Sequence, residues 1–182
     1  MVARHSGLTQ QETQLQSSEF IVSKTDVKGR ITYANRTFYS LSGFTEKEVM
    51  GVQHNIVRHP DMPRSVFALL WETIQQGKEV FAYVKNVRKD GGYYWVWANV
   101  TASTDMKGQL LGYHSVRRCP SREALPAVTA LYRQMLAAEK QAGAKDAVAA
   151  GKAVLTQALQ GQSYENFVLS LQSNKAIYVK QS

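Results

Sequence analysis

Ten residues from His54 to Pro63 gather much of the chemistry that this chain offers into one place. They include two imidazoles, a guanidinium, a carboxylate and a side-chain amide, and two prolines restrict the backbone around them. An arginine donates paired hydrogen bonds to a phosphate or carboxylate, and a histidine can donate or accept near neutral pH. We therefore predict that this segment, called the 54–63 string below, forms the wall of a ligand site.

A structural role for the 54–63 string is also open. Asp61 can cap the helix that is predicted to follow, Arg58 can pair with Asp61, and His59 can be a buried histidine with satisfied hydrogen bonds. His54 is expected at the surface. His114, on the last predicted strand, could face the same interior as the string.

No catalytic arrangement accompanies the string. The sequence holds no nucleophile and base at a useful spacing, no HExxH pattern and no glycine-rich phosphate loop. We therefore predict a binding protein and not an enzyme.

Short strands and helices must position the string. Apolar residues in 20–22 and 31–34 predict a hairpin whose turn ends at Gly29, and Thr45 with Glu48 forms a capping-box pattern for a short helix. Three longer strands are predicted over residues 80–88, 93–103 and 109–118. This order of elements predicts an α+β fold with a five-stranded antiparallel sheet.

The helix after the string has Phe67, Leu70, Trp71 and Ile74 at helical spacing, so we expect these side chains to pack in the core. Large side chains occur at alternating positions on both faces of the predicted middle strand. Both faces of the sheet should therefore be covered, one of them by an N-terminal helix or a second subunit.

Helices are predicted at both ends of the chain. A capping-box pattern begins a short helix over residues 9–17. Ser121 is expected to cap a long helix, an alanine-rich helix follows over residues 145–160, and a third begins near Tyr164. The long helix could pair two subunits or fold back on the sheet through one apolar face, made of Leu125, Val128, Tyr132 and Met135.

Charge and composition exclude several classes of protein. The net charge is +8, but the basic residues are scattered and form no dense stripe, so nucleic acid is not an expected partner. The single cysteine, Cys119, excludes an internal disulfide and a cysteine-built zinc site. The sequence has no run of ~20 apolar residues and no signal-peptide core, so we expect a cytoplasmic protein without a membrane span.

Several motifs occur in the order found in one known family. Thr25 and Asp26, followed by GRITYAN over residues 29–35, resemble the first hairpin of a PAS domain. NIVRHPDMP over residues 55–63 resembles the helical segment of the aerotaxis-receptor type, and YYWV over residues 93–96 resembles its central hairpin. The resemblance divides the chain into three parts: an N-terminal tail and cap helix over 1–17, a PAS sensor domain over 18–120 and a C-terminal helical extension over 121–182.

The resemblance implies a sheet curved around a small-molecule pocket and, in the aerotaxis type, FAD bound without a covalent bond. It also implies that Arg58, His59 and Asp61 help to bind the flavin, with Asn35 near the pocket. The full candidate set for cofactor binding is Asn35, Arg58, His59, Asp61, Trp71, Tyr83, Asn86 and Trp97. At Val80 this chain departs from the family, which often has a tryptophan there, near the isoalloxazine.

Chemical character supports distinct roles within this candidate set. Arg58 suits a pyrophosphate because its guanidinium matches phosphate oxygens as a fork of donors. His59 or Asn86 could hydrogen-bond the ring edge, while Trp71, Tyr83 and Trp97 could form the walls. Histidines also leave haem open as a cofactor.

Two functional hypotheses follow. In the first, the chain is a sensory PAS flavoprotein that signals redox state or oxygen to a chemotaxis or kinase component, most simply as a homodimer. In the second, the domain binds haem or another metabolite, or no ligand, and acts through dimerisation. Light-sensing relatives need a cysteine before the central hairpin, whereas Cys119 follows the last strand, so their photochemistry is not expected.

Overall fold

The computed structural model describes residues 7–173. These residues form two compact units. The sheet unit comprises the chain up to His59 together with Ile74–Cys119, and the helical unit comprises Pro60–Thr73 together with the chain from Pro120 on. The chain passes from the sheet unit to the helical unit between Cys119 and Pro120, and the second half of the 54–63 string belongs to the helical unit.

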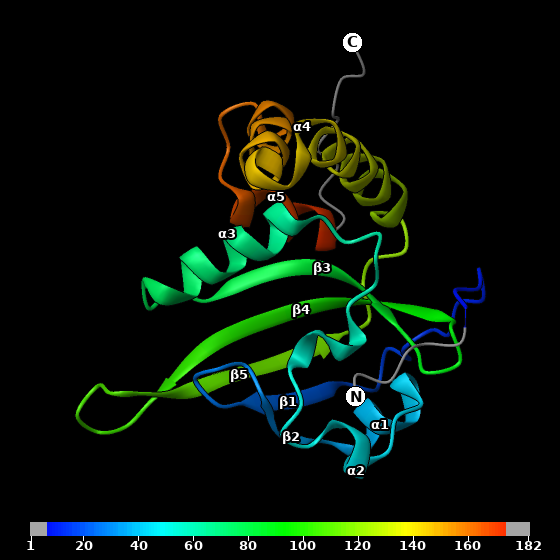
Figure 1. Ribbon diagram of the computed structural model, residues 1–182, viewed down its shortest axis with the longest axis vertical. Coiled ribbons are helices and arrows are strands. Elements are labelled where there is room, and N and C mark those ends of the chain that lie inside the picture. The colour runs from blue at the N-terminus through cyan, green and yellow to red at the C-terminus, as the bar shows by residue number, and fades with distance from the viewer. Residues whose placement is uncertain (1–6, 174–182) are drawn as a thin grey trace. The chain divides into compact units, whose positions relative to one another are not determined.

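The sheet unit contains five antiparallel strands in the order β2-β1-β5-β4-β3. The strands are β1 (Ile21–Thr25), β2 (Ile31–Ala34), β3 (Val80–Val87), β4 (Tyr93–Thr104) and β5 (Leu110–Arg118). Figure 1 shows the long strands β3, β4 and β5 side by side with β1 and β2 beyond them. The expected α+β fold with a five-stranded antiparallel sheet is confirmed.

Local chemistry explains the short elements between β2 and β3. Helix α1 (Arg36–Ser42) begins at Asn35, whose side chain accepts from the Phe38 amide, and ends at Gly43 with a left-handed φ of 75°. Helix α2 (Glu46–Val49) has the predicted capping box between Thr45 and Glu48. The 3₁₀ turn η1 (His54–Val57) follows and lies against one face of the sheet (Figure 1).

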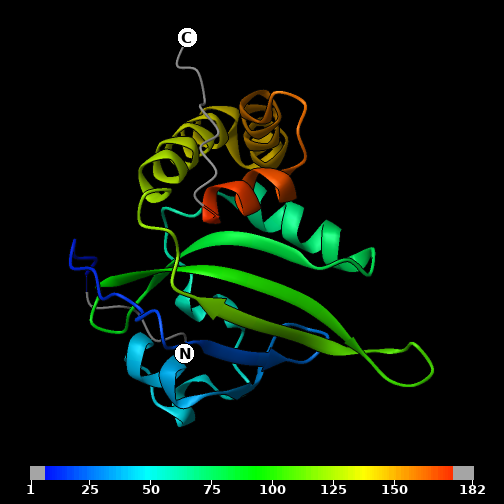
Figure 2. The ribbon, with the colours of Figure 1, turned by 180° about the vertical axis from the view of Figure 1, so that it is seen from behind.

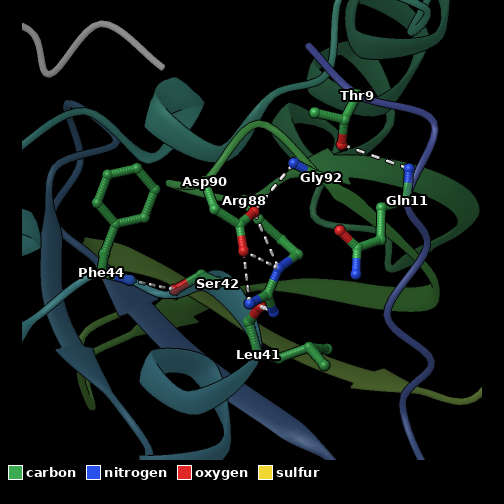
Figure 3. Close-up of polar contacts among 8 residues, drawn as sticks. All are labelled: Thr9, Gln11, Leu41, Ser42, Phe44, Arg88, Asp90 and Gly92. Carbon is green, nitrogen blue, oxygen red and sulfur yellow. Dashed lines mark hydrogen bonds and ion pairs between the residues drawn. The ribbon is translucent and has the colours of Figure 1, made fainter. Parts of the chain in front are cut away.

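Arg88 fixes the hairpin between β3 and β4. Its guanidinium donates to the Asp90 carboxylate on one side and to the Leu41 carbonyl on the other, as Figure 3 shows. The Asp90 carboxylate also accepts from the Gly92 amide at 2.9 Å, which closes the turn. Arg88 therefore ties the end of α1 to the hairpin between β3 and β4.

The helix predicted over residues 9–17 is not present. This segment is extended, with a parallel bridge between Glu12 and Tyr93 and backbone hydrogen bonds from Thr9 to Gly91 and from Thr13 to Tyr93, both 2.8 Å. Figure 2 shows it as the dark blue strand-like segment beside the hairpin. Pairing with β4 satisfies the backbone groups here, so the capping-box pattern does not decide the local structure.

The helical unit contains most of α3 (Arg64–Gln75), together with α4 (Leu125–Leu159) and α5 (Tyr164–Gln172). Helix α4 begins four residues after Ser121, with Ala124 at the cap position, so the predicted cap at Ser121 is wrong. Gly143 has φ 75° and ψ 175°, which divides α4 into two helices. The two successive helices predicted after residue 120 are thus confirmed, with their break at Gly143.

Candidate functional site

The 54–63 string meets the sheet at the edge strand β3. An isolated antiparallel bridge joins Arg58 to Asn86, and the His59 amide donates to the Lys85 carbonyl at 3.4 Å. Strand β3 is available because it ends the sheet order, which leaves one side of its backbone unpaired by another strand. Two of the predicted site residues, Arg58 and Asn86, are therefore neighbours.

Strand register identifies which residues share the face of the sheet that η1 covers, called the η1 face below. Directly paired residues lie on the same face. The His54 ring contacts Ser23, so the pairings that start from Ser23 and from Ile21 and Thr25, two residues to either side of it on β1, define this face. Its residues include Ile21, Ser23, Thr25, Val80, Ala82, Asn86, Tyr94, Ala98, Val100, Tyr113, Ser115 and Arg117.

Arg58 and His59 take opposite sides of β3. As the bridge partner of Asn86, Arg58 lies on the η1 face and is half-buried. His59 is buried and packs edge-on against Tyr93, with ring centroids 6.0 Å apart. Lys85 also lies over the Tyr93 ring, at 4.2 Å from Nζ to the centroid. The string therefore does not direct both side chains to one ligand surface.

Asn35 organises the backbone at the start of β1. Its Oδ1 accepts from the Val22 amide at 3.0 Å and from the Phe38 amide at 3.1 Å. Its Nδ2 donates to the Phe20 carbonyl at 2.9 Å. These contacts join β1 to α1, so Asn35 has a structural role beside the η1 face.

Tyr83 and Trp97 do not share a face with Asn86. They pair with each other across β3 and β4, and strand alternation places them on the side of the sheet away from η1. Tyr83 is fully buried, and Trp97 stacks on Phe81 with centroids 5.0 Å apart. A ligand on the η1 face would not meet these two rings, so the predicted walls need correction.

Asp61 and Trp71 belong to the helical unit. Asp61 is exposed, and Trp71 is 40% exposed, whereas Val66 and Leu70 on the same helix are buried. Trp71 therefore does not pack in the core as its spacing had predicted. The first amides of α3, at Arg64 and Ser65, donate to the Glu139 carboxylate of α4 at 2.9 and 2.8 Å.

A polar cluster that sequence reasoning missed lies on the η1 face. Arg117 donates from Nη2 to His54 Nε2 at 2.8 Å and from Nη1 to Ser23 Oγ at 3.1 Å. His54 Nε2 is also 3.0 Å from Ser23 Oγ. A signal for it exists in the sequence, because Ser23 and Arg117 are in phase with buried apolar residues along their strands. His54, which was expected at the surface, is half-buried, and its ring points to this cluster.

Burial controls the charge state of this cluster. Burial, with the nearby Arg117 charge, lowers the pKa of His54 to about 3, so the imidazole is neutral and accepts from the guanidinium through Nε2. Burial also lowers the pKa of Arg117 to about 10 and raises that of Tyr94 to about 12. At neutral pH the η1 face therefore holds one buried positive charge and a neutral phenol.

Two hydroxyl groups on the η1 face are buried without a partner among residues 7–173. They are Thr25 Oγ1 and Ser115 Oγ. Ser115 is 6% exposed and pairs with Ser23 across β1 and β5, while Thr25 is the next residue of β1 on the same face. Buried hydroxyls in proteins almost always have a hydrogen-bond partner, so these two groups mark a place for an acceptor or donor from elsewhere.

No group of three or more His, Cys, Asp and Glu side chains within residues 7–173 could hold a metal ion. His114 pairs with Lys24 on the face away from η1, so it does not face the interior that was considered for it. In the same part of the chain, no helix is both long and apolar enough to cross a membrane.

Comparison with known proteins gives the chain relatives. It is 41% identical over 134 residues to the aerotaxis receptor of Escherichia coli K12, a match that covers 74% of this chain and 26% of the receptor. It is 27% identical over 116 residues to the nitrogen fixation regulatory protein of Klebsiella pneumoniae, with 61% of this chain and 23% of that protein covered. The chain thus spans about a quarter of the length of these relatives.

Solved structures support the fold at lower identity. A structure from a study of a flavin analogue and the light-oxygen-voltage domain mechanism has a TM-score of 0.53 and 22% identity, covering 63% of this chain and 86% of its own. The light-state structure of the blue-light photoreceptor Aureochrome1 LOV has a TM-score of 0.52 and 21% identity, covering 65% and 90%. The sequence profile described as the PAS fold matches residues 9–119. The resemblance found in the motifs is therefore confirmed, and the chain belongs to the PAS family.

Proposed function

We propose that this chain is a sensory PAS domain that binds FAD and signals redox state or oxygen. The observation that carries the proposal is the bridge between Arg58 and Asn86. It fixes Arg58, which is part of the motif that resembles aerotaxis receptors, on the η1 face, and this face also holds two buried hydroxyls without a partner among residues 7–173. Identity of 41% to an aerotaxis receptor supports the same conclusion.

The residues of the η1 face fit the chemistry of a flavin nucleotide. FAD joins an apolar ring with a polar edge to a dianionic pyrophosphate, and when bound it supplies reversible electron acceptance. Arg58 is half-buried and suits the pyrophosphate, which remains partly hydrated. Buried small side chains at Val80, Ala82 and Ala98 give an apolar surface on the same face.

A flavin-free PAS domain is the second candidate, and Val80 favours it. Val80 is buried on the η1 face where related domains often carry a tryptophan, so an aromatic contact for the ring is missing. Haem gains no support from His54, because its Nε2 already accepts from Arg117. The domain would then bind another metabolite or act through association alone.

Dimerisation and the downstream partner are also proposals. The apolar face of α4 that was considered for subunit pairing is buried within one chain, since Leu125, Val128, Tyr132 and Met135 are at most 7% exposed. A homodimer would therefore use another surface or require this face to open. We propose a chemotaxis or kinase component as the receiver of the signal.

Visible absorption of the purified protein tests the proposal directly. We expect a flavin spectrum either as purified or after FAD is added and the excess removed, and mass spectrometry of the extracted ligand should give FAD. Titration by flavin fluorescence then gives the dissociation constants for FAD and riboflavin. If neither compound binds, the flavin function is wrong and the second candidate stands.

A charge variant tests the role of Arg58. Arg58→Gln should weaken FAD about tenfold or more, because a charge-assisted contact with the pyrophosphate is lost. Riboflavin, which has no pyrophosphate, should bind Arg58→Gln as it binds the wild type. Arg36→Gln is the matched control, since Arg36 is exposed on α1. Equal FAD binding by Arg58→Gln and the control would exclude Arg58 from the site.

A further inference from the structure

The guanidinium of Arg117 is a buried charge with no acidic partner. Arg117 is 7% exposed, and its hydrogen bonds within residues 7–173 are to Ser23 and His54, both uncharged. No carboxylate in the described part of the chain forms an ion pair with it. Buried charges in proteins are normally paired, because an isolated charge loses its hydration on burial.

Most of the hydrogen-bonding capacity of Arg117 is also unused. A guanidinium carries five N–H groups. Two of them have acceptors, Ser23 Oγ and His54 Nε2, so three have none among residues 7–173. The unpartnered hydroxyls of Ser115 and Thr25 lie on the same face, with Ser115 two residues before Arg117 on β5.

His54 and Ser23 hold the guanidinium in place. Both accept from it, and the neutral imidazole adds no competing charge. Two fixed contacts restrict the plane of the guanidinium, so its remaining N–H groups have set directions. His54 and Ser23 therefore position the guanidinium of Arg117.

We propose that Arg117, Ser115 and Thr25 form a subsite for an acceptor-rich planar edge, which for a flavin is the edge with the two ring carbonyls. This inference rests on the proposed flavin function and deepens it. A pyrophosphate is the less suitable occupant, because a dianion would lose most of its hydration beside a 7% exposed group. Arg58, which is half-buried, is the better partner for phosphate.

The subsite has a consequence for electron affinity. A fixed positive charge beside the ring edge favours the form of the ring that carries more negative charge. Removing the charge should therefore make the midpoint potential of the bound flavin more negative. This readout distinguishes a ligand contact from a structural role, because a merely structural residue would not shift the potential.

Titration of the full chain with FAD and with riboflavin tests the subsite. Arg117→Gln should weaken both compounds by the same factor, about tenfold to hundredfold, because the ring edge is common to both. Arg118→Gln is the matched control: this neighbouring arginine is exposed and lies on the opposite face. The control should bind both compounds as the wild type does, with an unchanged midpoint potential.

A second variant tests the subsite independently, in case Arg117→Gln does not fold. The double variant Ser115→Ala with Thr25→Val removes the unpartnered hydroxyls and leaves the guanidinium in place, and it should weaken both compounds by about tenfold. Unchanged binding of both compounds by either folded variant overturns the subsite, and so does a loss confined to FAD. A wild type that binds neither compound overturns the flavin function as well, which separates the two failures.

Discussion

Glu139 in the helical unit and Arg117 in the sheet unit are both buried charged groups, but their hydrogen-bond partners differ. In the helical unit, the Glu139 carboxylate is 6% exposed and accepts from two amides and one hydroxyl, at distances of 2.6 to 2.9 Å. In the sheet unit, the Arg117 guanidinium is equally buried, but three of its five N–H groups have no acceptor within residues 7–173.

This difference separates a structural group from a binding group. Glu139 gives α3 the acceptors that the start of a helix needs, and its carboxylate stabilises the positive end of the helix dipole. Its contacts are complete within the chain. Arg117 and the unpartnered hydroxyls of the η1 face lack hydrogen-bond partners among residues 7–173, so their burial adds little to the stability of the chain without a ligand. The comparison predicts that removing the Glu139 charge lowers the free energy of unfolding strongly, whereas removing the Arg117 charge changes it little.

The largest change in the free energy of unfolding should come from Glu139→Ala. The variant leaves the amides of Arg64 and Ser65 and the Ser65 hydroxyl without their acceptor, and we expect a loss of about 3–5 kcal/mol in the free energy of unfolding. Urea denaturation followed by circular dichroism measures it, with the exposed Glu165→Ala as control. A loss below about 1 kcal/mol would contradict the structural role of Glu139.

Gly151→Ala should damage the same contact by crowding. A Cβ atom at Gly151 would lie 2.3 Å from Ser65 Oγ and 2.7 Å from Glu139 Oε1, distances that require these groups to move. We expect a loss of about 2–3 kcal/mol, measured by the same denaturation. Ala153→Ser, at an exposed position on α4, is the control. Wild-type stability of Gly151→Ala would show that the cluster has room to adjust.

The fold follows largely from local sequence signals. The turn ending at Gly29, the capping box of Thr45 and Glu48 and the apolar alternation of the three long strands all correspond to elements in the structure. These signals act within a few residues, so their outcome depends little on distant parts of the chain. The segment over residues 9–17 is different, because its extended form depends on pairing with Tyr93, far along the sequence.

The candidate site was less predictable, since it depends on which way each side chain faces. The string was recognised, and Arg58 and Asn86 do meet, but Tyr83 and Trp97 lie on the other face. The hydrogen bond between Arg117 and His54 joins residues 63 positions apart, and no local pattern predicts such a pair. Cofactor binding by the predicted residues stays a prediction.

The acid response of the sheet unit sharpens the comparison further. The pKa of His54 is lowered to about 3 on folding, from an ordinary value of 6.5. Below pH 6.5, His54 becomes protonated in the unfolded chain but stays neutral in the folded chain. The stability that the neutral imidazole contributes is therefore fully present above pH 6.5 and is lost as the pH falls toward 3. Between pH 6.5 and 4.5, the His54→Gln variant should therefore lose about 2 kcal/mol less of its free energy of unfolding than the wild type does.

Urea denaturation at several pH values measures the contribution of His54. His114→Gln is a control of the same residue type, on the face away from η1, where burial and nearby basic groups also lower the pKa of the histidine. We expect its effect on the pH dependence to be smaller, since His114 is more exposed to solvent than the Arg117 cluster. Equal effects of the two variants would show that the Arg117 contact does not set the charge state of His54.

The smallest change in the free energy of unfolding should come from Arg117→Met, measured without ligand. Methionine fills a similar volume and removes a buried charge that has no acidic partner, while Ser23 Oγ and His54 Nε2, 3.0 Å apart, can still bond to each other. The free energy of unfolding should therefore change by less than about 1 kcal/mol, in contrast to Glu139→Ala. Excess FAD should raise the melting temperature of the wild type much more than that of Arg117→Met, because the ligand accepts hydrogen bonds from the remaining N–H groups of the guanidinium. A loss of about 3 kcal/mol or more in the ligand-free variant would instead make Arg117 a structural group like Glu139.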